Sequence, residues 1–241
     1  MQVYYRPHMY SNLKVRFPGS ENLQFNYSNL CQDMFVLSIL NGKLNGTFIE
    51  IGGELPIQGN NTVLLEKMFG WRGYSIELKP KYAPMWITDR TTPLYIQSAL
   101  DTDYVALAEK NNLGNIIDYL SVDIEPAEHT FASLQKIDHT RLRFKVITFE
   151  HDHYNGGQGP RVRLESREYL KSLGYLMIVG DISHAGHLAE DWWIAPEHFP
   201  SETIDKFLMS ETYNADEAVY IKGLLKRPGQ INLDQGHISI L

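Results

Sequence analysis

The stretch Thr47-Phe48-Ile49-Glu50-Ile51-Gly52-Gly53 decides the fold. A short, mostly apolar run that ends directly in two glycines is typical of a buried parallel strand turning into a loop. Glycine at that turn also lets a ligand approach the backbone closely. The stretch therefore predicts the first strand of an open α/β sheet with a ligand site after it; a plain strand-to-helix turn is the alternative.

Alternating strand and helix patterns extend from this stretch to about residue 180. We expect strands at 47–51, 73–77, 94–97, 116–122, 144–149 and 175–179. We expect helices at 28–41, with Ser28 as N-cap, and at 61–69, 103–110, 127–137 and 165–172. This alternation predicts a mostly parallel sheet with helices on both faces. The carboxyl ends of its strands then share one edge, where ligands bind in open α/β sheets.

Length and charge limit the classes of protein. The 241 residues predict a single domain, 1–241, with an N-terminal cap over 1–45 and a core over 46–241. The net charge of −7 argues against nucleic acid as a partner, because phosphate binding needs a basic surface. No long apolar run predicts a membrane span, and the start lacks the pattern of a signal peptide. With the single cysteine, Cys31, these features make a cytoplasmic protein the default expectation.

The predicted second strand ends in Glu77, where a carboxylate can accept hydrogen bonds from ribose hydroxyls. A solvated carboxylate is the alternative. The loop after the first strand lacks the G-x-G-x-x-G by which dinucleotide enzymes bind pyrophosphate. Glu50 and Glu54 in or beside that loop would repel phosphate. Together these features favour a positively charged sulfonium ligand.

Further blocks follow along the chain: 61–67, 70–77, 118–125 with Ala127-Glu128, 147–152 and 169–175. Together with Phe48–Gly52 they cover roughly residues 45 to 180. In order and spacing they resemble the FkbM-like family of class I S-adenosylmethionine-dependent methyltransferases, many of which O-methylate sugars.

The resemblance implies a Rossmann-like, seven-stranded, mostly parallel sheet with helices on both faces, the class I methyltransferase fold. It implies S-adenosylmethionine as cofactor, bound by Glu50, Gly52, Gly53, Asn61, Glu77, Ser98, Ala99, Leu100 and Asp123. Leu55 and Pro56 stand where the family usually has an acidic residue and a glycine, and Pro126 stands where it has a glycine. Because proline fixes φ and removes an N–H, we expect the first loop to contact the cofactor differently.

Two neighbouring strand ends carry titratable groups: Asp123 and Glu125 on one, and 150–153 (Glu-His-Asp-His) on the other. Carboxylates with histidine suit Mg²⁺ or Mn²⁺. Comparison with sugar O-methyltransferases favours Asp123 and Glu150 as metal ligands, with His151 or Asp152 as the third. Hydrogen-bonded carboxylates without a metal are the alternative. The predicted catalytic residues are His151, His153 and Asp123, with either histidine as general base because histidine titrates near neutrality.

The sequence thus predicts an O-methyltransferase that acts on a hydroxyl of a sugar, a glycan or a similar small polyol. Trp192 and Trp193 are expected either to stack on a sugar ring or to pack in an edge strand. Residues 154–160 are expected to form a mobile loop over the site. One alternative function is a nicotinamide-dependent oxidoreductase. Another is a catalytically inactive binding module, which Leu55, Pro56 and Pro126 favour. The oligomeric state is left open, with a homo-oligomer as one alternative.

Overall fold

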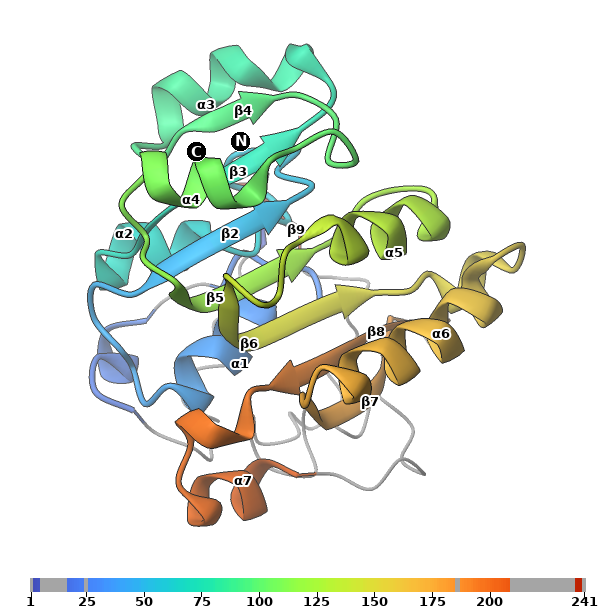
Figure 1. Ribbon diagram of the computed structural model, residues 1–241. Coiled ribbons are helices and arrows are strands. Elements are labelled where there is room, and N and C mark those ends of the chain that lie inside the picture. Colours follow the sequence, from blue (N-terminus) through green and yellow to red (C-terminus); the bar gives the residue numbers. More distant parts are fainter. Residues whose placement is uncertain (1, 5–16, 24–25, 185–186, 209–236, 240–241) are drawn as a thin grey trace.

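The computed structural model describes residues 2–4, 17–23, 26–184, 187–208 and 237–239 (Figure 1). Its main sheet contains β2 (Thr47–Ile51), β3 (Arg72–Glu77), β4 (Leu94–Ile96), β5 (Ile116–Val122), β6 (Arg143–Glu150), β7 (Leu176–His184) and β8 (His187–Ile194). Its α-helices are α1 (Gln32–Ile39), α2 (Val63–Phe69), α3 (Ala83–Asp89), α4 (Tyr104–Lys110), α5 (Ala127–Lys136), α6 (Gly159–Ser172) and α7 (Ser201–Phe207). A separate antiparallel pair joins β1 (Gln2–Tyr4) to β9 (His237–Ser239).

The seven strands lie in the order β4-β3-β2-β5-β6-β8-β7. The strands from β4 to β6 are parallel, and β8 is antiparallel to both of its neighbours, β6 and β7. The strand order reverses between β2 and β5, and that is where open α/β sheets bind ligands. The predicted Rossmann-like, seven-stranded, mostly parallel sheet is confirmed.

Helices cover both faces of the sheet (Figure 1). Phe48 packs with side chains of α1 and α2 on one face, whereas the next residue, Ile49, packs with α4, α5 and α6 on the other. Successive residues of a strand point to opposite faces, so a strand buried on both sides is mostly apolar. All five residues of β2 are buried: three are apolar, and the carboxylate of Glu50 accepts hydrogen bonds from Ser75 and Asn60.

The two tryptophans of β8 belong to the core. Trp192 and Trp193 are both 0% exposed, and they point to opposite faces of the sheet. Trp192 stacks on Phe35 of α1, with ring centroids 4.4 Å apart. The expectation that they stack on a sugar is therefore wrong, and β8 is an inner strand rather than the edge strand of the alternative.

Some element boundaries differ from the prediction. Helix α1 begins at Gln32, because Ser28 is used elsewhere: it bridges to Gly59, and its Oγ bonds Asp33 Oδ1 at 2.5 Å. Helix α3 was not predicted. Gly159 and Pro160 open α6 instead of belonging to a loop, as a proline in the first turn loses no helical hydrogen bond. Among the helices of the described residues, none has the length and apolar character to cross a membrane.

The packing of Trp192 predicts a large effect on stability. We expect Trp192→Ala to lower the free energy of unfolding by about 3–5 kcal/mol, because it removes a fully buried aromatic side chain and leaves a cavity. Ile87→Ala is the matched control: Ile87 is 84% exposed, so a change within about 0.5 kcal/mol is expected. Urea unfolding of the three proteins measures both values, and equal stabilities would contradict the assigned core.

Candidate functional site

A cavity of about 310 Å³ opens at the carboxyl ends of β2, β3, β4 and β5. This volume lies in the range of small-molecule sites. Its walls include Glu77, Asp123 and the predicted segment Ser98-Ala99-Leu100. The structure therefore brings these five predicted cofactor residues to one cavity.

Gly52 fixes the position of the turn after β2. Its φ is +96°, and a Cβ at this position would lie 1.7 Å from the carbonyl oxygen of Asp123. The amides of Gly52 and Gly53 both donate to Ile76 O, and Asp123 N donates to Ile51 O at 2.9 Å. Only glycine fits such a conformation and such a close backbone contact. The turn and the end of β5 are thus held together at the edge of the site.

Glu77 lies at the end of β3 and is 6% exposed. Its Oε2 accepts from the amide of Glu54 at 3.0 Å, and its Oε1 accepts from the amide of Lys79 at 2.7 Å. Two peptide N–H groups thereby hold the carboxylate at the cavity wall. Charge-assisted bonds of this kind are among the stronger hydrogen bonds in proteins.

A second cavity, of about 320 Å³, borders the first, and both are lined by Glu54, Asp123, Glu125 and Glu150. Gly52 and Gly53 line it from the turn, and Asn29, Leu30 and Gln32 line it from the N-terminal region. No lysine, arginine or histidine is among the described residues that line it. A third cavity lies beyond Glu125 and is lined by Asp152 and residues 155–159.

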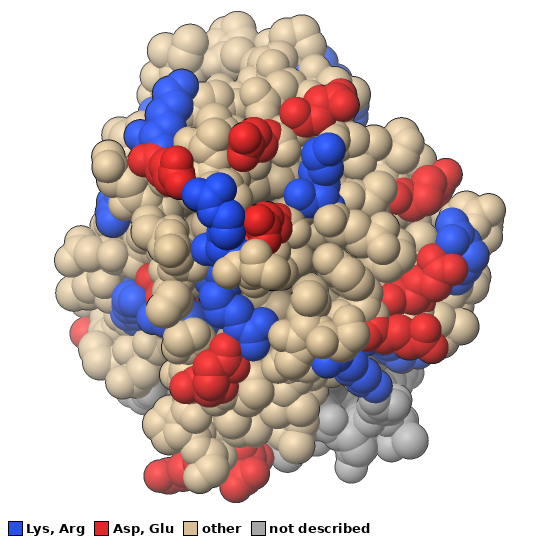
Figure 2. Space-filling view, viewed as in Figure 1, with Lys and Arg blue, Asp and Glu red and all other residues tan. Residues whose placement is uncertain are grey.

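The acidic character is a property of the cavity walls. On the face drawn in Figure 2, acidic and basic side chains of the described residues are interspersed. The acidic lining of the second cavity is therefore local to its four carboxyl groups and does not extend over this whole face.

Glu150 stands where the two cavities meet, and it lies opposite Glu190 in the β6–β8 register. Burial raises the pKa of Glu150 well above its ordinary value, and a hydrogen bond to Asp123 and the surrounding carboxylates raise it further. Glu190 is fully enclosed and accepts hydrogen bonds from Trp192 Nε1 at 2.5 Å and Gln32 Nε2 at 3.0 Å. Burial nevertheless raises the pKa of Glu190 to about 8. Both carboxyl groups therefore hold protons more tightly than an exposed glutamate does.

The predicted role of His151 is not supported by its position. His151 is 0% exposed, and its Nε2 lies 3.6 Å from Asp191 Oδ1 and 3.9 Å from Asp181 Oδ1. It lies on the α6 side of the sheet, away from Asp123 and Glu150, so these three predicted metal ligands do not converge. His153 lies at the start of the short 3-10 helix His153–Asn155, and its amide donates to His151 Nδ1. Neither histidine lines the three described cavities.

The grouping of His151, Asp181 and Asp191 is the one set with metal-ligand spacing among the described residues. Its carboxylates are already paired: Arg163 bonds Asp181, and Arg167 bonds both aspartates. Burial raises the pKa of Asp191, but the hydrogen bonds and charges of Arg167 and His151 outweigh burial and hold it well below its usual range. Two guanidinium groups occupy the positions that a cation would need, so this set does not fit a metal.

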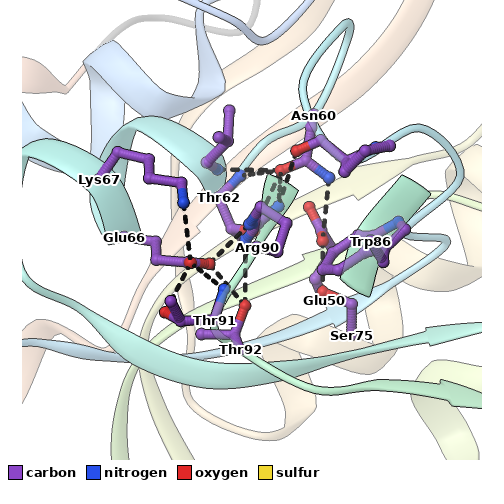
Figure 3. Close-up of polar contacts among 12 residues, drawn as sticks. Glu50, Asn60, Thr62, Glu66, Lys67, Ser75, Trp86, Arg90, Thr91 and Thr92 are labelled. Carbon is purple, nitrogen blue, oxygen red and sulfur yellow. Dashed lines mark hydrogen bonds and ion pairs between the residues drawn. The ribbon is translucent and has the colours of Figure 1, made fainter. Parts of the chain in front are cut away.

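Glu50 and Asn61 are also placed away from the cavities. Glu50 is 1% exposed, and its Oε2 accepts from Ser75 Oγ at 2.5 Å and Asn60 Nδ2 at 3.2 Å (Figure 3). Asn61 Nδ2 donates to Ser121 Oγ at 2.9 Å. Neither is among the described residues that line the cavities, so their predicted contact with the cofactor is corrected to a structural role beneath the site.

Several lining residues were missed. They are Leu78, Lys79, Gln97, Ile124 and His129 in the first cavity, and Asn29, Leu30, Gln32, Gln58 and Gly59 in the second. Leu78 and Lys79 directly follow a strand end, and this position was an available signal. Gln32 offered none, because it comes to the site only through the packing of α1.

No protein-family model matches the chain, and no curated protein matches its sequence. Solved structures match it in part. A structure described as a candidate rRNA methylase from Clostridium thermocellum has 16% identity and a TM-score of 0.48, over 71% of this chain and 99% of that chain. A SAM-dependent methyltransferase from Aquifex aeolicus has 14% identity and a TM-score of 0.45, over 69% of this chain and 91% of that chain. The M. jannaschii protein TYW2 in complex with AdoMet has 12% identity and a TM-score of 0.40, over 72% and 79%. At these values the likeness carries no functional conclusion, which depends on the site.

The raised pKa of Glu190 predicts a pH-dependent stability. Between about pH 4.5 and 8 the unfolded state has released this proton and the folded state keeps it, so stability falls as pH rises through this window. Glu190→Gln stays neutral and should remove this part of the fall. We expect the variant, relative to wild type, to gain free energy of unfolding from about pH 5 to about pH 8, as urea titrations would measure. The substitution also alters hydrogen bonds, but that cost is the same at every pH and does not affect the change with pH. If variant and wild type differed in free energy of unfolding by the same amount at every pH, the assignment would be contradicted.

Proposed function

We propose that this chain is a methyltransferase that transfers a methyl group from S-adenosylmethionine to a hydroxyl of a sugar or similar polyol. The observation that carries the proposal is the pair of adjoining cavities, with Glu77 held at the wall of one and Asp123 and Glu150 at their border. The first cavity suits the nucleoside end of the cofactor, because a fixed carboxylate accepts hydrogen bonds from ribose hydroxyls. The second suits the acceptor and, along the loop after β2, the amino-acid end of the cofactor.

The charges of the site agree with this assignment. When bound, the cofactor supplies a methyl group on a positively charged sulfur. Opposite charges about 4 Å apart attract by about 4 kcal/mol near a protein surface, so the carboxylates at the border would favour the sulfonium. The same carboxylates disfavour pyrophosphate, which argues against a nicotinamide dinucleotide and against phosphorylated acceptors.

Proton transfer completes the chemistry. The acceptor oxygen forms a bond to the methyl carbon, the carbon–sulfur bond breaks, and its electron pair stays on sulfur. The hydroxyl proton passes to a carboxylate at the border. We assign this role to the deprotonated form of Glu150, which is a stronger base than an exposed glutamate because its pKa is raised, and which becomes more abundant as the pH rises. No step in this scheme uses a metal. Of the two candidates for the third ligand, His151 lies beside Asp181 and Asp191, and Asp152 lines the third cavity rather than the two that meet at Glu150.

We propose the FkbM-like family as the finer assignment. What supports it is the order of the sequence blocks from Phe48–Gly52 to Tyr169–Tyr175. The site is consistent with the sugar class, because the second cavity offers carboxylate and amide acceptors and donors to hydroxyl groups.

The first test is cofactor binding. We expect saturable binding of S-adenosylmethionine and S-adenosylhomocysteine in calorimetric titrations, and about a tenfold or greater loss of affinity in Glu77→Ala, which removes charge-assisted hydrogen bonds. Glu109→Ala is the control, since Glu109 is exposed on α4 and pairs with Arg141. Absence of binding by the wild type would refute the methyltransferase and leave the inactive binding module.

The second test concerns the proton acceptor. With a methylated acceptor identified from a panel of sugars, Glu150→Gln should lower kcat by about a hundredfold or more, the contribution typical of general base catalysis. Its affinity for S-adenosylhomocysteine should stay within about threefold of wild type. A comparable loss in His153→Gln but not in Glu150→Gln would restore the histidine as base. Stimulation of the wild type by Mg²⁺ or Mn²⁺, abolished by chelation, would contradict the metal-free scheme.

A further inference from the structure

Arg90 is a buried arginine whose hydrogen-bonding capacity is fully used (Figure 3). Its side chain is 0% exposed and follows α3. Its partners are Glu66 Oε2 at 2.6 Å, Asn60 Oδ1 at 2.9 Å, Thr62 Oγ1 at 2.9 Å, Pro56 O at 3.0 Å and Thr92 Oγ1 at 3.3 Å. A guanidinium has five N–H donors, so each has one acceptor.

Glu66 balances the charge of Arg90. Burial raises the pKa of Glu66, but the charge of Arg90 and hydrogen bonds from Thr92, Thr91 and Arg90 outweigh burial and lower it to about 2. The pair is therefore ionised at neutral pH. A buried ion pair with every donor satisfied holds its neighbours in one geometry, because breaking one contact leaves an unpaired charge.

Arg90 reaches three carbonyls of the loop after β2. It bonds Pro56 O directly. Arg90 also donates to Asn60 Oδ1, and Asn60 Nδ2 in turn donates to a second carbonyl, Gly53 O, at 3.2 Å. It also stacks on Trp86, with Cζ 4.3 Å from the ring centroid, and Trp86 Nε1 donates to Glu54 O at 2.9 Å.

The direction of these carbonyls determines the direction of the neighbouring amides. In a trans peptide the C=O and the following N–H point to opposite sides. The peptide between Gly53 and Glu54 shows the result: its carbonyl faces Asn60, and its N–H reaches Glu77, which lines the first cavity. By the same rule, the N–H groups of Leu55 and Ile57 point away from Trp86 and Arg90.

We propose that Arg90 is a positioning residue for the cofactor: it holds the loop carbonyls on the α3 side and thereby presents the amide of Leu55 to the carboxylate of S-adenosylmethionine's amino-acid end. This inference rests on the proposed function. Leu55, Gly53 and Glu54 line the second cavity, where carboxylate side chains would otherwise repel that group. A peptide N–H can bind an anionic group without a basic side chain.

The proposal also accounts for Pro56. A proline carbonyl accepts hydrogen bonds as other carbonyls do, although proline donates none. At this position the loop needs an acceptor for Arg90 and no amide. The loop therefore owes its shape here to a buried guanidinium.

The test compares two ligands that differ at the amino-acid end. S-adenosylhomocysteine has that end, whereas methylthioadenosine has the adenine, ribose and sulfur without it. We expect Arg90→Lys to weaken the binding of S-adenosylhomocysteine about tenfold or more and to leave the affinity for methylthioadenosine within about twofold of wild type. The reason is that lysine keeps the positive charge but loses the planar set of five N–H donors. Trp86→Phe keeps an aromatic ring but loses the N–H that donates to Glu54 O. It should also weaken the binding of S-adenosylhomocysteine, by less than Arg90→Lys does.

Arg143→Lys is the matched control. Arg143 also stacks on an aromatic ring, Tyr175, at 3.9 Å and pairs with a carboxylate, Glu197, but it lies at the start of β6. Arg143→Lys should leave the affinities for S-adenosylhomocysteine and methylthioadenosine unchanged. Melting temperatures show which variants fold. If Arg90→Lys does not fold, Trp86→Phe provides the test. Equal losses for both ligands, or no loss for either, would overturn the inference. A wild type that binds neither ligand would instead refute the proposed function.

Discussion

The contact between Gly52 and the carbonyl of Asp123 is the constraint on which the rest of the site depends. It brings the end of β2 against the end of β5 where the strand order reverses. The backbone bond from Asp123 N to Ile51 O closes the same junction. Because no side chain fits there, the turn lies flat against the sheet edge, and the two cavities adjoin around Asp123. A wider junction would separate the region that suits a cofactor from the region that suits an acceptor.

The buried carboxyl groups around this junction illustrate two physical solutions. Glu66 and Asp191 each have an arginine, so they stay ionised and act as fixed structural anchors. Glu150 and Glu190 face other carboxylates, so burial raises their proton affinity. Arginine side chains thus stabilise the ionised carboxylates of the scaffold, whereas Glu150 at the border of the cavities, and Glu190 behind it, have raised pKa values. Such a division leaves titratable carboxyls where proton transfer is needed.

Much of the fold could be predicted because β2, β5 and β6 are rich in apolar residues and are followed by glycine or by polar residues. The edge of the sheet that holds the site follows from the parallel arrangement of these strands. Which face a residue at a strand end points to could not be predicted as safely. His151 follows Glu150 and therefore points to the opposite side, toward α6, where Asp181 and Asp191 meet it. Glu50 lies within β2, before the turn, and its carboxylate is held by Ser75 and Asn60 instead of facing the cavities.

Arg90 could not be recognised from the sequence, because an arginine after a short helix is usually exposed. Its burial depends on partners from the loop, from α2 and from the residues before β4, and only the tertiary structure brings these together. Gln32 was hidden for a similar reason, since α1 reaches the site across the sheet face.

The place of β8 has a consequence for how the chain folds. The last strand of the main sheet to be synthesised lies inside it, between β6 and β7. Until residues 187–194 have left the ribosome, β6 and β7 each present an unpaired edge, and exposed edges pair readily with other chains. A chain that stops short of β8 therefore loses the interior of its sheet rather than one margin. In a growing chain, β7 can join the main sheet only after β8 has been made, because β8 is the strand that links β7 to β6.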